Sequence, residues 1–208
     1  MIKRTVLNIG SGANVMQAPH YEDFYELKLD VNEDYEPDIV ADLLEIDEDW
    51  FAERPHYHHV FDAVHMSHVL EHFYSWQNDR IMEAIKGFLK EDGMLDIYVP
   101  DILAAARKMV RQAGAKGLDT VMYTVGKNQE MKIKFHDMLY GYPYGEDEWM
   151  GHKQGFDMRK LVKTVRPHFK HAYQINRGGV MELGIVALVQ EANWHDYLFT
   201  FNKGSNHG

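Results

Sequence analysis

The chain has 208 residues, 45% hydrophobic and 26% charged, and a formal net charge of −10 from 32 acids and 22 bases. That is enough for a single α/β domain, and the acidic balance argues against long-range attraction to nucleic acid or an anionic membrane. There is no cysteine, which excludes disulfides, thiolate metal sites and cysteine nucleophiles. The sequence contains no run of about 18 apolar residues, so no membrane-spanning helix is predicted. The first residues, MIKRTVLNIG, lead directly into a strand-like segment and do not have the pattern of a signal peptide. We therefore expect a cytoplasmic protein.

Seven segments have the composition and length of β-strands. Five of them fall in the first hundred residues: TVLNIG (5–10), FYELKLDV (24–31), DIVADL (38–43), FDAVHMS (61–67) and GMLDIYVP (93–100). Near the end, AYQINR (172–177) and LGIVALVQ (183–190) flank Gly178 and Gly179, which predicts an antiparallel pair joined by a turn.

Helices are expected between the later strands, each with a capping residue followed by apolar residues at helical spacing. The first is capped by Ser75, carries Ile81, Ile85, Phe88 and Leu89, and is followed by Gly93. The second is capped by Asp101 and carries Leu103, Ala106 and Val110. The third begins at Asp157 and buries Leu161, Val162 and Val165. This order of strands and helices predicts an α/β sheet.

Two segments lack a regular spacing of apolar residues. Pro19 interrupts the residues between Gly12 and Asp30, so a first helix is expected to be short or distorted. Residues 114–156 mix glycine, aromatic residues and charge, which is more typical of a lid or binding loop than of core. We therefore expect one domain over residues 1–195, with an irregular lid at about 114–156, and a tail at 196–208.

The segment NIGSGAN (8–14) contains the end of the first strand and the turn after it. Gly10 and Gly12 allow a sharp turn and a close approach of the backbone to a ligand, but Val15 stands where a dinucleotide fingerprint needs a glycine. Asp30 ends the second strand, 18 positions after Gly12, where an acid can accept both hydroxyls of a ribose. Asp42 closes the third strand at the same edge. Taken singly, each acid can also be an ordinary turn residue.

The segment HVLEH can be interpreted in two ways. As H-x-x-E-H it matches a zinc-peptidase signature in which His68 and His72 are ligands and Glu71 is the general base. Within FDAVHMSHVLEHF it is instead the end of a buried strand that runs into a helix beside a cofactor.

The segments VLNIGSGAN, YELKLDV, PDIVADL, FDAVHMSHVLEHF and FLKEDGMLDIYVPD resemble, in order and spacing, the class I S-adenosylmethionine-dependent methyltransferases. The resemblance is closest to the type 11-like methyltransferases with an "hVLEH" segment, and it covers residues 4–101 best. It implies a Rossmann-like fold: a mostly parallel seven-stranded sheet with an antiparallel terminal strand pair and helices on both faces. It also implies S-adenosyl-L-methionine as the cofactor.

The resemblance assigns roles to particular residues. The cofactor would contact Gly10, Ser11 and Gly12 under its methionine part and ribose, Asp30 and the adjoining Val31 at the ribose hydroxyls, Asp42 and the backbone of Leu43 at the adenine, and Met66 and Ser67 beside the sulfonium. His68 would point towards the acceptor, and Glu71 and His72 would support the site. Asn8 stands where many relatives have an acid, and can accept a hydrogen bond from the ligand. Asn14 replaces the third glycine of the loop.

Two alternatives to this interpretation differ in class. A zinc hydrolase needs both histidines on a helix and a third carboxylate from a later helix, and it would leave the glycine loop unexplained. We therefore expect no metal. A non-catalytic partner subunit of the same fold is suggested by Asn8, Asn14 and the shortened first helix, whereas Asp30 and Asp42 argue against it.

The acceptor side is less determined by the sequence. Candidates for a general base are His68, Asp101 and His152, with His136 a further one, although Asp101 can equally be a helix cap. The absence of cysteine excludes cytosine C5-methylation through a thiol adduct. We expect an O or N atom of a small molecule or glycan as the acceptor, with no nucleic-acid or membrane partner. A homodimer is left open.

Overall fold

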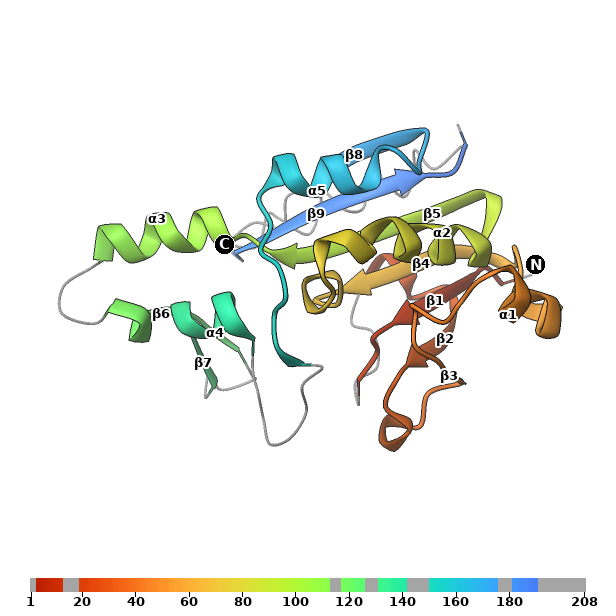
Figure 1. The fold of residues 1–208 in the computed structure, drawn as a ribbon, viewed down its shortest axis with the longest axis horizontal. Helices are drawn as coiled ribbons and strands as arrows, with labels where there is room; N and C mark the ends of the chain where they lie inside the picture. The colour runs from red at the N-terminus through yellow and green to blue at the C-terminus, as the bar shows by residue number, and fades with distance from the viewer. Residues whose placement is uncertain are drawn as a thin grey trace.

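The computed structural model of this chain describes residues 3–12, 19–112, 117–125, 131–141, 150–175 and 181–190. A seven-stranded sheet is made of, in spatial order, β3 (Ile39–Val40), β2 (Tyr25–Asp30), β1 (Thr5–Ile9), β4 (Phe61–Ser67), β5 (Leu89–Pro100), β9 (Glu182–Leu188) and β8 (His171–Ile175). The first five strands pair in parallel, and β9 is antiparallel to β5 and β8 (Figure 1). The predicted sheet and its antiparallel terminal pair are confirmed. The turn predicted at Gly178 and Gly179 lies outside the described residues.

The described residues also form five α-helices and six short 3-10 helices. The α-helices are α1 (Glu48–Glu53), α2 (Asn78–Phe88), α3 (Ile102–Gln112), α4 (Phe135–Tyr140) and α5 (Met158–Val165). The 3-10 helices are η1 (Pro19–Tyr21), η2 (Glu33–Tyr35), η3 (Pro55–Tyr57), η4 (Leu70–His72), η5 (Ser75–Gln77) and η6 (Gly117–Asp119). None of the described helices has the length and apolar character needed to cross a lipid bilayer.

The predicted helix starts are partly confirmed. Asp101 Oδ1 accepts the N–H of Ala104 at 2.9 Å, and Asp157 Oδ1 accepts the N–H of Lys160 at 2.8 Å. These bonds satisfy backbone donors that a first helical turn leaves unpaired. The cap predicted at Ser75 is wrong, because Ser75 begins η5 and α2 starts three residues later without a side-chain cap.

One boundary between helix and strand differs from the prediction. Leu89 is expected as the last apolar residue of a helix that ends near Gly93, but it is extended and pairs with Phe61 of β4. Helix α2 therefore ends at Phe88, and Gly93 lies inside β5. Leu89 is only 1% exposed in the strand, so its apolar character does not distinguish the two arrangements.

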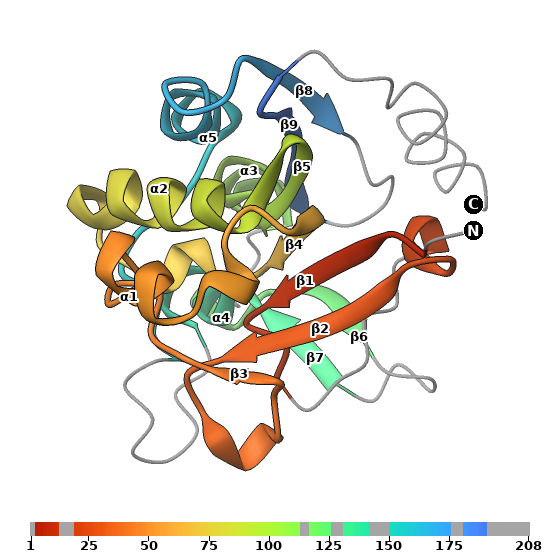
Figure 2. The same cartoon turned by 90° about the vertical axis from the view of Figure 1, so that its right-hand side faces the viewer.

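Successive side chains of a strand point to opposite faces of the sheet, and apolar residues cover both faces here. On one face, Leu7 and Ile9 of β1 join a large core that also contains apolar residues of α1, α2 and α5. Figure 2 shows these three helices side by side on that face. On the opposite face, Val6 packs in a smaller cluster with Tyr21 and Phe24, which come from η1 and the turn after it.

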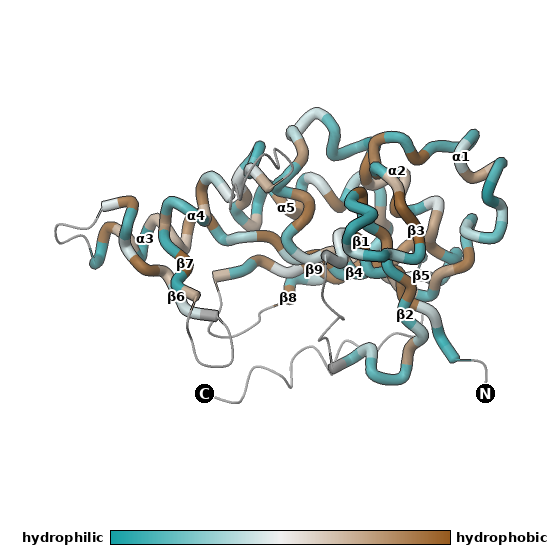
Figure 3. The backbone as a smooth tube through the Cα atoms, turned by 90° about the horizontal axis from the view of Figure 1, so that it is seen from below, coloured by the Kyte–Doolittle hydropathy of each residue, from teal (hydrophilic) through white to brown (hydrophobic). Residues whose placement is uncertain are grey.

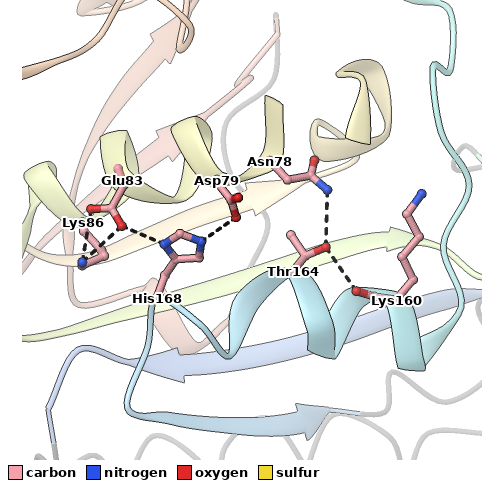
Figure 4. Close-up of polar contacts among 7 residues, drawn as sticks. All are labelled: Asn78, Asp79, Glu83, Lys86, Lys160, Thr164 and His168. Carbon is pink, nitrogen blue, oxygen red and sulfur yellow. Dashed lines mark hydrogen bonds and ion pairs between the residues drawn. The ribbon is translucent and has the colours of Figure 1, made fainter. Parts of the chain in front are cut away.

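Polar contacts join α2 to the end of α5 (Figure 4). The ring of His168 lies between two acids of α2, with Nδ1 2.7 Å from Glu83 Oε1 and Nε2 2.9 Å from Asp79 Oδ1. Deeper in the interface, Asn78 Nδ2 donates to Thr164 Oγ1 at 3.4 Å. The acids are largely exposed, so these ion pairs are expected to add little to stability.

Residues 102–141 include a small lobe beyond the carboxyl ends of β4 and β5 (Figures 1 and 3). The segment predicted as an irregular lid is regular in part, because β6 (Val121–Val125) and β7 (Met131–Lys134) form an antiparallel pair beside α3 and α4. Its role as a lid stays a prediction. The core of the lobe consists of Ala105, Met122, Ile133, Phe135 and Met138. Leu103 and Val110 of α3 are 45% and 70% exposed, so the buried face of α3 differs from the predicted one.

A buried polar row crosses the middle of the sheet on the face opposite the large core. Asn8, His65 and Asp96 are paired in register on β1, β4 and β5. Asp96 is fully buried; its Oδ2 is 2.8 Å from His65 Nδ1, and its Oδ1 accepts the hydroxyl of Tyr21. Burial alone would raise the pKa of Asp96, but the charges and hydrogen bonds of His65 and His20 outweigh it and lower that pKa.

We predict that Asp96→Asn lowers the free energy of unfolding at pH 7 by about 2 kcal/mol or more, because it removes a charge to which buried donors bond. The pKa of Asp96 is lower in the folded protein than in the unfolded one, so this stabilisation is present above the unfolded value near 3.8 and is lost as the pH falls below it. Urea unfolding at pH 7 and pH 3 measures both effects. A difference between wild type and variant that does not shrink at pH 3 would contradict the assignment.

Candidate functional site

A cavity of about 470 Å³ opens at the carboxyl ends of β1, β2 and β4. Its volume is within the range of small-molecule sites, and it lies where the strand order reverses between β1 and β4, as ligand sites of open α/β sheets do. Its walls are formed by Gly10, Ser11, Gly12, Asp30, Val31, Asn32, Tyr35, Ser67, His68, Val69, His72, Phe73 and Met150. The predicted glycine loop and the predicted end of the fourth strand therefore meet at one cavity.

The glycine loop depends on the absence of side chains. Gly10 and Gly12 have φ angles of +66° and +55°, in the left-handed region that favours glycine. A Cβ on Gly10 would lie 2.3 Å from Cγ2 of Val69, whereas a Cβ on Gly12 would meet no atom within 4 Å. Gly10 therefore allows the loop after β1 to pack against the turn after β4, and Gly12 borders open space.

Asp30 connects the end of β2 to the glycine loop. Its Oδ2 accepts the N–H of Gly12 at 2.8 Å, and its Oδ1 accepts the N–H of Asn32 at 3.0 Å. The residue is 8% exposed and lines the cavity. Each carboxylate oxygen has a further lone pair, so the group can accept two more hydrogen bonds from a ligand while it holds the loop.

Four predicted cofactor contacts do not line the cavity. Asn8 donates through Nδ2 to Glu26 Oε1 at 2.8 Å, and Asp42 Oδ1 accepts the N–H of Leu44 at 2.9 Å. Leu43 and Met66 are 3% and 0% exposed and belong to the large core. Their assignment to the cofactor stays a prediction, and Asn14 lies outside the described residues.

His68 lies at the cavity with an unusual backbone and two acidic neighbours. Its φ is +57°, which is strained for a residue with a side chain. Its Nε2 is 2.7 Å from Glu182 Oε1, and its Nδ1 is 3.2 Å from Glu71 Oε1. Burial opposes charging the ring, but the hydrogen bond to Glu182 and the negative charges of Glu71 and Glu182 outweigh it and raise the pKa of His68 to about 10. At neutral pH this ring is therefore a donor of hydrogen bonds.

The other candidate bases do not line the cavity. Asp101 caps α3, which confirms the alternative interpretation of that residue. His152 donates from Nδ1 to the carbonyl of Met138 at 3.0 Å, and burial lowers its pKa. The side chain of His136 is 48% exposed beside Asp137.

The segment HVLEH does not form the helix that the zinc-peptidase signature requires. Strand β4 ends at Ser67, and Leu70–His72 is a single 3-10 turn. His68 pairs with the two acids instead, and Glu182, on β9, had no signal in the sequence that linked it to this site. Asn32, Tyr35, Phe73 and Met150 are further cavity residues that the sequence did not indicate.

No protein-family model matches this sequence, and a search of curated proteins finds no match. Solved structures do match. An S-adenosylmethionine-dependent methyltransferase from Archaeoglobus fulgidus is 13% identical, with 89% of this chain and 86% of that chain covered and a TM-score of 0.54. An S-adenosylmethionine-dependent methyltransferase from Mesorhizobium loti is 13% identical, with 89% of this chain and 91% of that chain covered and a TM-score of 0.50.

A third similar structure is the 1,6-didemethyltoxoflavin-N1-methyltransferase of Burkholderia thailandensis, solved with 1,6-didemethyltoxoflavin and S-adenosylhomocysteine. It is 14% identical to this chain, the match covers 90% of this chain and 72% of that one, and the TM-score is 0.50. At these identities the similarity shows the fold. The chain has the Rossmann-like fold of class I methyltransferases.

We predict that Gly10→Ala lowers the free energy of unfolding by about 2–4 kcal/mol, because a side chain there is strained by its φ angle and overlaps Val69. Gly12→Ala is the matched control: its φ has the same sign but the new methyl group meets no atom, so a loss of only about 1 kcal/mol is expected. Urea unfolding measures both. Equal losses would show that the contact with Val69 does not constrain the loop.

Proposed function

We propose that this chain is an S-adenosyl-L-methionine-dependent methyltransferase that transfers a methyl group to an O or N atom of a small molecule or glycan. The single observation that carries the proposal is the position of Asp30, whose carboxylate holds the Gly12 amide at the wall of the cavity and keeps acceptor capacity for a ligand. A sugar with two adjacent hydroxyls matches that capacity.

Other features of the cavity support a nucleoside cofactor. The backbone of Gly10 to Gly12 approaches the cavity without side chains on the two glycines, so the ligand can lie directly against it. Val31 and Tyr35 add apolar surface beyond Asp30, and Val31 is 40% exposed. These are the residue types expected around a ribose and an adenine ring. The narrower resemblance to the "hVLEH" subgroup, which would add Asp42 and Leu43, is part of the same proposal.

The reaction needs little chemistry from the protein. S-adenosylmethionine supplies an activated methyl group when bound, so the chain has to align the acceptor atom with it and exclude water. Ser67 and His68, at the end of β4, border the cavity where a reacting group would lie. Both ring nitrogens of His68 face acids, Glu182 and Glu71, so this ring would border the acceptor as a fixed positive charge. Phe73 and Met150 would provide an apolar wall.

Asp30→Ala tests the proposal. We expect it to weaken binding of S-adenosylhomocysteine at least about a hundredfold, since two hydrogen bonds to a charged group are lost. Asp34→Ala is the matched control, because Asp34 is an exposed acid of the adjacent η2 helix that does not line the cavity. Isothermal titration calorimetry measures the affinities, and circular dichroism verifies that each variant is folded.

The outcomes separate the alternatives. Unchanged binding in Asp30→Ala would overturn the ribose assignment. No binding by the wild-type protein would favour a non-catalytic partner subunit of the same fold.

A further inference from the structure

Glu71 is a buried acid whose carboxylate has more acceptor capacity than its ion pair with His68 uses. It is 1% exposed, and neither carboxylate oxygen has a hydrogen-bond partner among the described residues. His68 Nδ1 lies 3.2 Å from Oε1, at ion-pair distance, but this ring also contacts Glu182. His68 therefore balances only part of this carboxylate, and the unused acceptors of a buried carboxyl group are costly unless a further cation or donor occupies the space beside it.

Two histidines adjoin Glu71 from different parts of the chain. His72 follows it in η4, and His152 comes from the segment after the small lobe. One potential ligand atom from each of the three residues lies within 4.8 Å of the others. The backbone holds this arrangement, because the carbonyl of Glu71 accepts the N–H of Lys153 at 2.8 Å and of Gln154 at 3.3 Å.

His152 has the orientation of a metal ligand. Its Nδ1–H donates to the carbonyl of Met138 at 3.0 Å, which leaves the lone pair on Nε2. Nε2 lies 3.9 Å from Glu71 Oε1. Histidines that bind metals commonly donate their other ring N–H to a backbone carbonyl in this way. The donor atoms of a tetrahedral site with bonds of about 2.1 Å lie about 3.4 Å apart, so small side-chain rotations would close the site.

We propose that Glu71, His72 and His152 bind one divalent transition-metal ion, with zinc the ion that the ligand set fits. Two imidazoles and one carboxylate are ligands for zinc and for iron, manganese or cobalt in their divalent states, and they leave at least one coordination position open. His72 also lines the cavity, so the site adjoins the space assigned to the acceptor.

The ion would have a consequence for the acceptor, and this step rests on the proposed methyltransferase function. An open coordination position beside the cavity would bind an oxygen or nitrogen of the acceptor and help to hold that atom in place for transfer. The metal site itself does not depend on that function.

Zinc titration of the full-length protein, freed of tags and chelators, tests the proposal. We expect wild type to bind one equivalent tightly, and His152→Ala and Glu71→Gln each to weaken this binding at least tenfold. His56→Ala is the control, since His56 is an exposed histidine of η3 outside the group. Cobalt(II) gives an independent measurement: its visible absorption when bound reports the ligand geometry and should be lost in His152→Ala.

S-adenosylhomocysteine binding is measured on the same samples, so that the two proposals fail separately. Tight zinc binding that His152→Ala and Glu71→Gln weaken and His56→Ala does not would support the site, whether or not S-adenosylhomocysteine binds. No stoichiometric zinc in the wild-type protein, or equal zinc affinity in His152→Ala, would overturn it. In that case the three side chains only join η4 to the segment after the lobe.

Discussion

The contact between Gly10 and the side chain of Val69 is the constraint on which the cavity depends. Strands β1 and β4 are neighbours in the sheet, and this contact joins the loop that follows β1 to the turn that follows β4. With Gly10 in the left-handed conformation, the loop continues to Gly12, whose amide then reaches Asp30 at the end of β2. The turn that contains Val69 also places His68 at the cavity. Small changes at this contact would therefore alter both the loop and the turn.

Much of the sheet could be predicted from the sequence, because its strands are short apolar runs separated by glycine, proline and acidic residues. β4 has the predicted bounds, β1 is one residue shorter than predicted at its carboxyl end, and β2 is one residue shorter at each end. The predicted residues that line the cavity all lie at the end of a strand or in the turn directly after it: Gly10, Ser11, Gly12, Asp30, Val31, Ser67 and His68. The carboxyl ends of parallel strands lie at one edge of a sheet, so sequence order alone brings them together.

What the sequence could not give are the contacts between distant side chains. His68 with Glu182, and His65 with Asp96, join residues 114 and 31 positions apart, and no periodicity reports such pairs. The small lobe was missed because its strands and α4 have six residues or fewer, too short for a helical or alternating pattern to be distinguished. Leu89 was misplaced because burial is required of it in a helix or a strand.

A structure of the protein crystallised with S-adenosylhomocysteine tests the central claim most directly. The account predicts the ligand in the cavity between the Gly10 to Gly12 loop and the end of β4. Its two ribose hydroxyls should lie within hydrogen-bond distance of the Asp30 carboxylate. A ligand bound elsewhere, or in the cavity with its ribose away from Asp30, would contradict the account.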